Sequence, residues 1–126
     1  MAEREGKSLT SDHDAGLWVR MDTQDVEEVI GNLLDNALKW CQTTVQITAK
    51  RVEEGIQICI EDDGPGIPEI AREGVLRSGG RLDTSVSGTG LGLAIAVDLL
   101  NAYGCKLTLD TSQKLGGLAC QILISK

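Results

Sequence analysis

The stretch from Thr23 to Trp40 constrains the fold most strongly, because its apolar residues recur at the spacing of a core-facing helix. Those residues are Val26, Val29, Ile30, Leu33, Leu34, Ala37 and Leu38. Thr23 is the expected N-cap of this helix. The acidic residues Asp25 and Glu28 then lie near the positive end of the helix dipole, which stabilises the same start.

A second stripe on the same helix carries polar residues, namely Glu28, Asn32, Asn36 and Lys39. Asparagine has weak helix propensity, and an exposed helix face ordinarily carries glutamate, lysine or alanine instead. The amide oxygens of Asn32 and Asn36 suit a small hard cation that also binds phosphate oxygens, with Lys39 one turn further on. A merely solvated face is the alternative, and the helix alone does not separate the two.

Size, charge and cysteine usage narrow the classes of protein that fit. The chain has 126 residues, enough for one domain with a sizeable core. Its net charge of -7 argues against a dedicated nucleic-acid surface, which ordinarily shows a basic excess. No apolar run approaches the length of a membrane span, and no signal peptide is expected at the start. Without CxxC spacing, the cysteines are expected to be reduced core residues: Cys41, Cys59, Cys105 and Cys120.

The remaining pattern predicts an α+β fold in which one mixed sheet is covered on one face by helices. Residues 1–15 are polar and are expected to be a linker ahead of a domain over residues 16–126. Leu17, Val19 and Met21 alternate with polar residues, which predicts a short strand before the first helix. Further strands are expected over Thr43 to Val52, Ile56 to Glu61, Cys105 to Asp110 and Leu118 to Ile124, with a short helix over Ile70 to Val75 and a long one ending at Tyr103, capped by Gly104.

Two glycine-rich segments suggest a ligand site. Asp62-Asp63-Gly64-Pro65-Gly66 follows an apolar strand, where a carboxylate can accept a hydrogen bond from an exocyclic amine and glycines admit a flat ligand. Gly88-Thr89-Gly90-Leu91-Gly92 opens the second long helix, where backbone N–H groups can converge on an anion. An acidic turn and an ordinary helix-entry loop are the respective alternatives. The segment from Leu76 to Gly88 shows little periodicity and is expected to be a mobile loop.

Taken together, three segments resemble a known family. The N-box pattern of Asn32 to Lys39 is followed by Asp62 to Ile67 and by Gly88 to Leu93, in that order and at suitable separations. From about Leu17 to Ile124 the chain is similar to the catalytic ATP-binding domain of sensor histidine kinases, in the superfamily that also holds gyrase, Hsp90 and MutL. Within that group it looks most like the PhoQ-type sensors. The resemblance implies the Bergerat ATP-binding fold, a two-layer α/β sandwich with about five strands covered on one face by about three helices.

The resemblance also implies a role for each matching residue. Asn32 would ligate Mg²⁺, Asn36 would contact phosphate or the metal shell, and Lys39 would balance phosphate charge. Asp62 would accept a hydrogen bond from the adenine amine. The remaining residues expected to hold ATP are Gly64, Gly66, Ile67, Gly88, Thr89, Gly90, Leu91, Gly92 and Leu93.

Arginines of the expected lid, residues 76–87, complete the implied site. Arg81 is the candidate arginine that would bind the γ-phosphate, and Arg72 and Arg77 are the alternatives because they are near it in the sequence. The lid motif of the family carries a phenylalanine, whereas this chain contains none, which puts the anchor of the lid in question. The only histidine, His13, lies in the polar leader and is not expected to accept phosphate.

Three functions remain open on the sequence. The first is a protein-histidine kinase that transfers the γ-phosphoryl group of Mg-ATP to a histidine on a separate dimerisation domain, for relay to a response regulator. The second is an ATPase-type switch with Glu28 as the base, and the third is a degenerate protein-binding module. A kinase of this kind is expected to be a homodimer at the inner membrane, with this domain on the cytoplasmic side, monomeric by itself and without a nucleic-acid partner.

Overall fold

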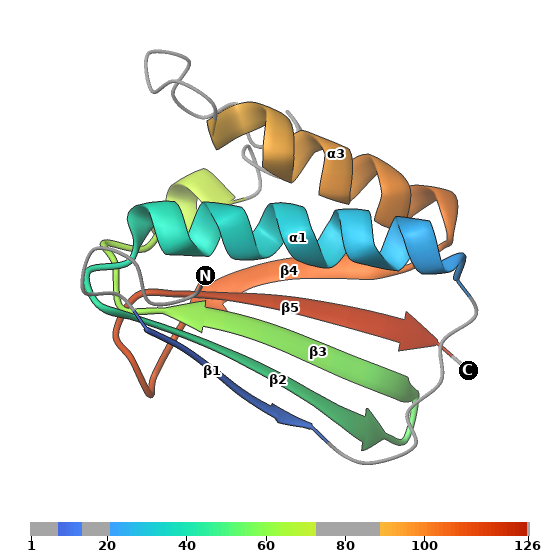
Figure 1. The fold of residues 1–126 in the computed structure, drawn as a ribbon, viewed down its shortest axis with the longest axis horizontal. Helices are drawn as coiled ribbons and strands as arrows, with labels where there is room; N and C mark the ends of the chain where they lie inside the picture. The colour runs from blue at the N-terminus through green and yellow to red at the C-terminus, as the bar shows by residue number, and fades with distance from the viewer. Residues whose placement is uncertain (1–7, 14–20, 73–88, 126) are drawn as a thin grey trace.

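A computed structural model describes residues 8–13, 21–72 and 89–125 of the chain. Within these residues the strands form one mixed sheet in the order β1-β2-β3-β5-β4, in which β1 is parallel to β2 and the other neighbours are antiparallel. The strands are β1 (Ser8–His13), β2 (Thr44–Val52), β3 (Gly55–Asp62), β4 (Lys106–Thr111) and β5 (Leu118–Ser125). Two long helices, α1 (Thr23–Trp40) and α3 (Thr89–Ala102), cover one face of this sheet (Figure 1). The predicted α+β sandwich is confirmed.

Helix α1 has the bounds that its sequence pattern predicts. Val29, Leu33 and Ala37 are buried on its core side. The N-cap differs from the prediction, because Asp22 rather than Thr23 occupies that position. A carboxylate oxygen of Asp22 accepts a hydrogen bond from the backbone N–H of Gln24 at 3.0 Å, which satisfies a donor left free at the helix start.

Helix α3 ends at the predicted glycine. Gly104 has a φ of +72°, in the left-handed region that glycine adopts without strain. Its backbone N–H donates to Asn101 at 3.0 Å, and that of Cys105 donates to Leu100 at 2.9 Å. These two bonds form a Schellman motif, which turns the chain directly into β4.

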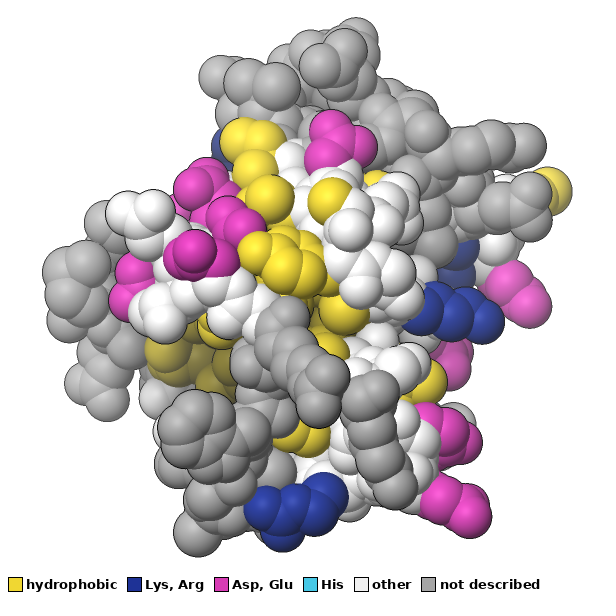
Figure 2. Space-filling view, turned by 90° about the vertical axis from the view of Figure 1, so that its right-hand side faces the viewer, with side chains coloured by type: hydrophobic (Ala, Val, Ile, Leu, Met, Phe, Trp, Pro, Cys, Tyr) yellow, Lys and Arg dark blue, Asp and Glu magenta, His cyan; other side chains and the backbone are white. Residues whose placement is uncertain are grey.

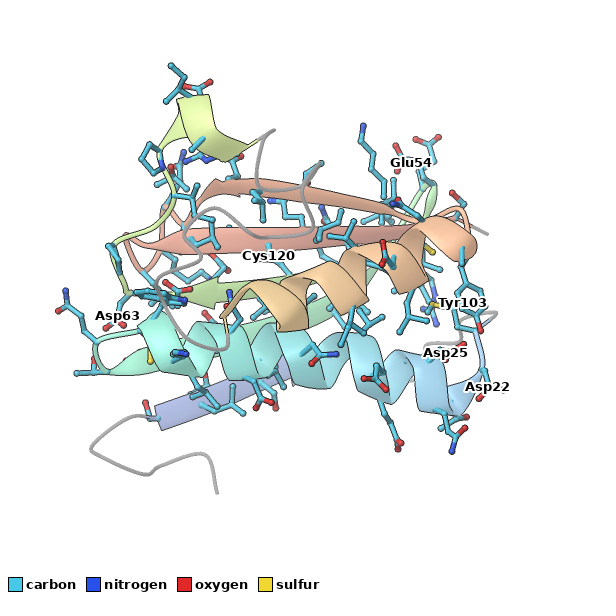
Figure 3. The ribbon with its side chains drawn as sticks, turned by 90° about the horizontal axis from the view of Figure 1, so that it is seen from above. Asp22, Asp25, Glu54, Asp63, Tyr103 and Cys120 are labelled. Carbon is cyan, nitrogen blue, oxygen red and sulfur yellow. The ribbon has the colours of Figure 1, made fainter. Side chains whose placement is uncertain are left out.

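Tyr103 joins the end of α3 to the start of α1. Its hydroxyl donates to the carboxylate of Asp25 and accepts a hydrogen bond from the backbone N–H of Asp22 at 3.2 Å. The three residues lie together at one end of the molecule in Figure 3, whereas Asp63 lies at the other end. The two helices therefore pack antiparallel, so that the start of α3 lies beside the last turns of α1 (Figure 1).

The core between the sheet and the helices is aliphatic. Its fully buried apolar side chains include Leu33, Val45, Ile60, Leu100 and Ile122. All four cysteines are free thiols, as predicted, and three of them are buried: Cys41, Cys105 and Cys120. Burial raises the pKa of the Cys120 thiol to about 12, so this side chain stays protonated and packs as a small apolar group.

The start of the chain differs from its prediction. Ser8–His13 lies within the segment expected to be a linker, yet it forms the edge strand β1 and pairs with β2 from Ser8 opposite Thr44 to His13 opposite Ala49. The strand carries little apolar signal, because at the sheet edge only Leu9 packs against the core. Of the strand predicted through Leu17 and Met21, only Met21 is among the described residues, and it lies in a bend.

The other connections follow the predicted pattern. A turn at Glu53 and Glu54 joins β2 to β3, and a second hairpin with Gly116 and Gly117 in its loop joins β4 to β5. Residues 69–72 are helical, within one position of the start of the predicted short helix. Across the described ranges, none of the helices combines the length and the apolar character needed to cross a bilayer.

Candidate functional site

The predicted site segments that the structure describes lie toward one end of the molecule. The last turns of α1, the C-terminal end of β3, the start of α3 and the helical residues 69–72 all lie toward the left of Figure 1. A close contact joins the first two directly, because a Cβ on Gly64 would come within 2.4 Å of the carbonyl oxygen of Trp40. Only glycine fits there, so the Asp-Asp-Gly segment packs against the final residue of α1.

The polar stripe of α1 faces the side on which α3 packs. Asp25, which lies on the same side of the helix about one turn before Glu28, is bonded to Tyr103 at the end of α3. Asn32 and Asn36 follow on the same side, about two and about three turns further along the helix. Both asparagines are partly buried, whereas Lys39 is exposed. Because α3 runs antiparallel, its first turns lie toward the end of α1 that carries Asn36 and Lys39 (Figure 1).

The amide of Asn32 is oriented by its neighbour one turn earlier. Its Nδ2 donates to the backbone oxygen of Glu28 at 2.8 Å and to Oε2 of the same residue at 3.4 Å. This leaves the amide oxygen for another group, and that hard neutral donor fits Mg²⁺. The described residues hold no cluster of three or more His, Cys, Asp or Glu side chains that would bind a metal by itself. A magnesium ion here would therefore take further ligands from phosphate oxygens or water.

Asp62 ends β3, and its side chain is only 4% exposed. Its Oδ1 accepts hydrogen bonds from the backbone N–H groups of Gly64 at 2.9 Å and Leu118 at 3.2 Å. Burial raises the pKa of this carboxyl above its ordinary value, although the two N–H bonds oppose the shift. No described residue donates to Oδ2. One carboxylate oxygen is thus fixed by the protein, and the other is left to accept from a ligand.

Glycines surround this carboxylate. A Cβ on Gly117 would lie 2.4 Å from both the backbone oxygen and Oδ1 of Asp62. Gly66 has a φ of +73° and lies against the backbone of Gly117. Gly117 was missed as a site residue in the sequence, because the Gly116-Gly117 pair indicated only a hairpin turn. Gly117 meets the end of β3 because β5, which follows it, pairs with β3. The sequence pattern does not show which strands pair.

Asp63 has a structural task next to the site. Its carboxylate accepts from the backbone N–H groups of Gln42 at 2.8 Å, Thr43 at 3.1 Å and Thr44 at 3.2 Å, and from the Thr43 hydroxyl at 2.8 Å. Although burial opposes them, these hydrogen bonds lower the pKa of Asp63 to about 2. The end of β3 is thereby fixed to the connection between α1 and β2, which positions Asp62 beside the helix.

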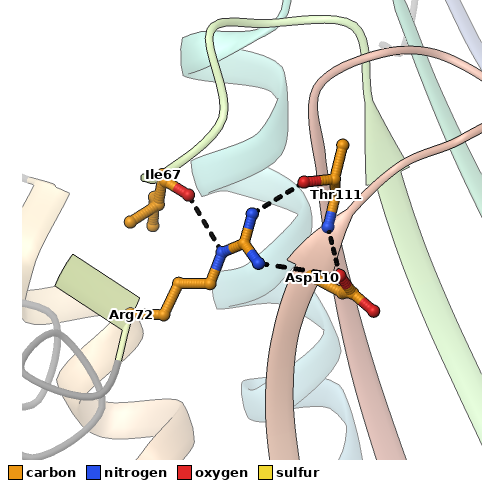
Figure 4. A network of polar contacts seen from close by, with 4 residues as sticks. All are labelled: Ile67, Arg72, Asp110 and Thr111. Carbon is orange, nitrogen blue, oxygen red and sulfur yellow. Dashed lines mark hydrogen bonds and ion pairs between the residues drawn. The ribbon is translucent and has the colours of Figure 1, made fainter. Parts of the chain in front are cut away.

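The remaining predicted residues are placed as follows. Ile67 is partly buried against the core. The backbone of residues 89–93 forms the first turns of α3: Thr89, Gly90, Leu91, Gly92 and Leu93. Gly88, Arg77 and Arg81 lie outside the described residues, as does the expected lid. Arg72, a competitor for the γ-phosphate, instead binds groups of the protein on Ile67, Thr111 and Asp110 (Figure 4).

A hollow of about 530 Å³ runs along α1 from Gln24 to Asp35. It is lined by Gln24, Asp25, Glu27, Glu28, Gly31, Asn32 and Asp35. Figure 2 shows the end of the molecule where α1 begins, with acidic side chains gathered beside apolar ones. The carboxylates of this hollow would repel a triphosphate. The phosphates of a nucleotide therefore suit the last turns of α1, which carry Asn36 and Lys39, and Asn32 lies where the hollow meets these turns.

Comparison with known proteins places this geometry in a family. The family model described as histidine kinase-, DNA gyrase B- and HSP90-like ATPase matches residues 21–124. The sensor protein kinase CarS of Pseudomonas aeruginosa is 46% identical over 107 residues, which cover 85% of this chain and 24% of CarS. The sensor protein PhoQ of Escherichia coli K12 is 36% identical over 124 residues, covering 98% of this chain and 25% of PhoQ. The chain thus spans about a quarter of the length of these curated relatives.

Solved structures show the same fold. The mycobacterial sensor histidine kinase MprB superposes with a TM-score of 0.77 at 28% identity, over 93% of this chain and 83% of that one. The ATP binding domain of PrrB from Mycobacterium tuberculosis gives a TM-score of 0.78 at 24% identity, over 96% and 81% of the two chains, a likeness of fold alone. With the family match over nearly all of its described length, the chain belongs to the histidine kinase-, DNA gyrase B- and HSP90-like ATPase family, as a catalytic ATP-binding domain of the sensor histidine kinase type.

Proposed function

We propose that this domain binds ATP with Mg²⁺ where α1, β3 and α3 meet, and that it transfers the γ-phosphoryl group to a histidine on a separate dimerisation domain. The observation that carries the proposal is the carboxylate of Asp62. It is buried among glycine backbones; its Oδ1 is bonded to the protein, and none of the described residues donates to its Oδ2. Such a fixed acceptor, set at the edge of a flat glycine surface, fits the exocyclic amine of adenine.

The Asp62 carboxylate would also select adenine over guanine. Adenine presents an amine where guanine presents a carbonyl oxygen, and an ionised carboxylate accepts from the first but repels the second. Gly64 and Gly66 carry no side chain between the loop and a planar base. Oδ2 of Asp62 would therefore select ATP over GTP.

Residues of α1 and α3 would bind the phosphate end of the ligand. Mg²⁺, when bound with its nucleotide, would offset the negative charge that develops on the phosphates. The oxygen of Asn32 would hold the metal, Asn36 would contact phosphate or the metal shell, and Lys39 would add positive charge from the last turn of α1. The backbone N–H groups at the start of α3, including those of Gly90 and Gly92, suit an anion at a helix N-terminus.

Transfer itself requires alignment more than covalent chemistry from this chain. The nucleophile would be a histidine of another domain, because His13 lies on the edge strand β1 and not at the site. Arg81, in the expected lid, would bind the γ-phosphate. The whole protein would be a homodimeric inner-membrane sensor whose histidine passes phosphate to a response regulator, with this domain on the cytoplasmic side and monomeric when isolated.

Asp62→Asn tests the proposal directly. The variant keeps an oxygen for the N–H groups of Gly64 and Leu118, but it presents an amide N–H₂ to the ligand instead of an acceptor. We expect binding of Mg-ATP to weaken on the order of tenfold or more, and preference for ATP over GTP to fall, as measured by calorimetric titration. Glu54→Gln, in the exposed β2–β3 turn, is the control. Wild-type protein that fails to bind Mg-ATP, or unchanged binding by Asp62→Asn, would disprove the proposal.

An ATPase-type switch is the second candidate, and the position of Glu28 favours it. Its carboxylate lies 3.4 Å from the amide nitrogen of Asn32, on the stripe that would hold the metal. A base at this place could activate water for hydrolysis. Steady phosphate release by the isolated domain, abolished in Glu28→Gln, would support this function. Radiolabelled phosphate appearing on a supplied histidine domain, with little release to water, would support the kinase instead.

A further inference from the structure

Arg72 connects three segments of the chain through one guanidinium group (Figure 4). Its Nε donates to the carbonyl oxygen of Ile67 at 2.9 Å, and its Nη2 donates to Oγ1 of Thr111 at 2.7 Å. Its Nη1 forms an ion pair with Oδ1 of Asp110 at 3.6 Å. The helical residues 69–72, the loop after β3 and the end of β4 are therefore joined by a single side chain, which is 18% exposed.

The loop after β3 has few other restraints at its far end. Pro65 and Pro68 have no backbone N–H to donate. Among the described residues, Arg72 is the sole hydrogen-bond partner of the Ile67 carbonyl. Gly66, with its φ of +73°, gives the chain next to Ile67 additional conformational freedom. Apart from the packing of the Ile67 side chain against the core, the position of this part of the loop thus depends on Arg72.

The near end of the same loop is fixed to the same hairpin. The backbone N–H of Gly117 donates to the backbone oxygen of Asp62 at 3.0 Å, and that of Leu118 donates to its Oδ1 at 3.2 Å. Leu118 pairs with Thr111 across β5 and β4. The loop therefore meets one end of the β4–β5 hairpin twice, through Asp62 at its start and through Arg72 at its finish.

We infer that Arg72 is a positioning residue for the purine. Through the carbonyl oxygen of Ile67 it holds the loop after β3 in the position in which the base can reach the carboxylate of Asp62. The inference rests on the proposed function. The planar guanidinium donates in several fixed directions and so reaches three acceptors on different segments, which the single ammonium of a lysine does not. Nε, Nη1 and Nη2 of Arg72 each have a partner within the protein, which favours Arg81 over Arg72 as the arginine that binds the γ-phosphate.

The test compares the binding of ligands that contain or lack the adenine base and the γ-phosphate of ATP. Arg72→Ala should weaken Mg-ATP and Mg-ADP by the same factor, on the order of tenfold, and should lower the preference for ATP over GTP. Binding of magnesium tripolyphosphate, which has no base, should not change. Arg72→Lys should restore part of the affinity. Lys106→Ala, which removes an exposed charge at the other end of β4, is the control and should bind like the wild type.

A second variant removes one partner and leaves the arginine in place. Thr111→Val suits a strand position and deletes only the acceptor for Nη2, so it should weaken Mg-ADP in the same direction but less. Added to Arg72→Ala, it should have no further effect on ligand affinity, because the contact is already lost. Thermal melting of each variant shows that it is folded, and if Arg72→Ala does not fold, Thr111→Val decides the question.

Several results would overturn the inference. A loss confined to Mg-ATP, with Mg-ADP unaffected, would assign Arg72 to the γ-phosphate. An equal loss for all ligands, including tripolyphosphate, would mean that the side chain supports the fold in general. Wild-type binding that Arg72→Ala and Thr111→Val leave unchanged would disprove the inference alone, whereas a wild-type domain that binds no nucleotide would disprove the proposed function with it.

Discussion

Asp62 and Asp63 are adjacent in the chain but have opposite environments. Burial raises the pKa of Asp62, whereas hydrogen bonds from the α1–β2 connection, outweighing burial, lower that of Asp63 to about 2. Alternation along the strand end explains the difference, because successive side chains point to opposite sides. The acidic pair by itself does not separate the two carboxylates; only the family resemblance pointed to Asp62 as the ligand acceptor, and nothing in the sequence indicated the structural task of Asp63. The different environments of the two carboxylates depend on long-range partners, Leu118 for Asp62 and Thr43 for Asp63.

The lowered pKa of Asp63 predicts how stability depends on pH. The folded pKa of about 2 lies below the ordinary value of 3.8, so the ionised carboxylate stabilises the fold above about pH 4 and this contribution is lost as pH falls toward 2. Asp63→Asn should cost about 1–2 kcal/mol of unfolding free energy at pH 7, and the difference from wild type should shrink between pH 4 and pH 3. Urea denaturation at several pH values measures both. A difference that stays constant with pH would contradict the assignment.

Two glycines offer a matched pair of substitutions. Gly64→Ala places a Cβ 2.4 Å from the Trp40 carbonyl oxygen, so the backbone must shift, and we expect a loss of about 1–3 kcal/mol in unfolding free energy. Gly31→Ala, inside α1, meets nothing within 4 Å and should stabilise the helix by about 0.5–1 kcal/mol. Denaturant unfolding of both variants gives the comparison, and equal effects would show that the close contact is not what requires glycine at position 64.

At the scale of elements, the sequence predicted most of what local pattern controls. The bounds of α1, its buried face and the C-cap of α3 at Gly104 follow from periodicity and glycine placement, and the structure confirms them. Strand β1 was not predicted, because a polar edge strand is specified by pairing with β2 and not by its own apolar pattern. The contacts of Arg72 were not predicted for a related reason, since its partner Thr111 is 39 residues away.

The link between the two helices gives a prediction at this scale. Tyr103→Phe keeps the ring but removes the hydroxyl that bonds Asp25 and the backbone N–H of Asp22. We expect a loss of about 1 kcal/mol in unfolding free energy, with faster amide exchange in the first turn of α1. Hydrogen exchange measured by NMR locates the effect. The exposed substitution Asp98→Asn on α3 is the control, and uniform exchange in both variants would argue against a local link.

At the scale of the whole molecule, the sheet has one layer of helices and two edges. The described site segments lie toward a single end, while the Tyr103 contact lies at the other (Figure 1, Figure 3). This separation means that variants at the Tyr103 end can change how the helices pack without touching the ligand. The roles of individual residues at the site remain predictions, because they depend on a nucleotide meeting Asn32 and Asp62 in the same place.

The six residues of β1 have a consequence for how this protein behaves in solution. A shortened chain that starts at residue 14 would uncover the outer N–H and C=O groups of β2, which β1 now pairs in parallel. A second molecule can satisfy such a bare ladder by adding its own strand. The intact chain also has an outer ladder on β1, but that strand is shorter and more polar than β2, so we expect the shortened chain to self-associate more readily than the intact chain. Size-exclusion chromatography with light scattering measures this, and a monomeric shortened chain would contradict it. The least conspicuous segment of the sequence would then be the one that keeps neighbouring molecules apart.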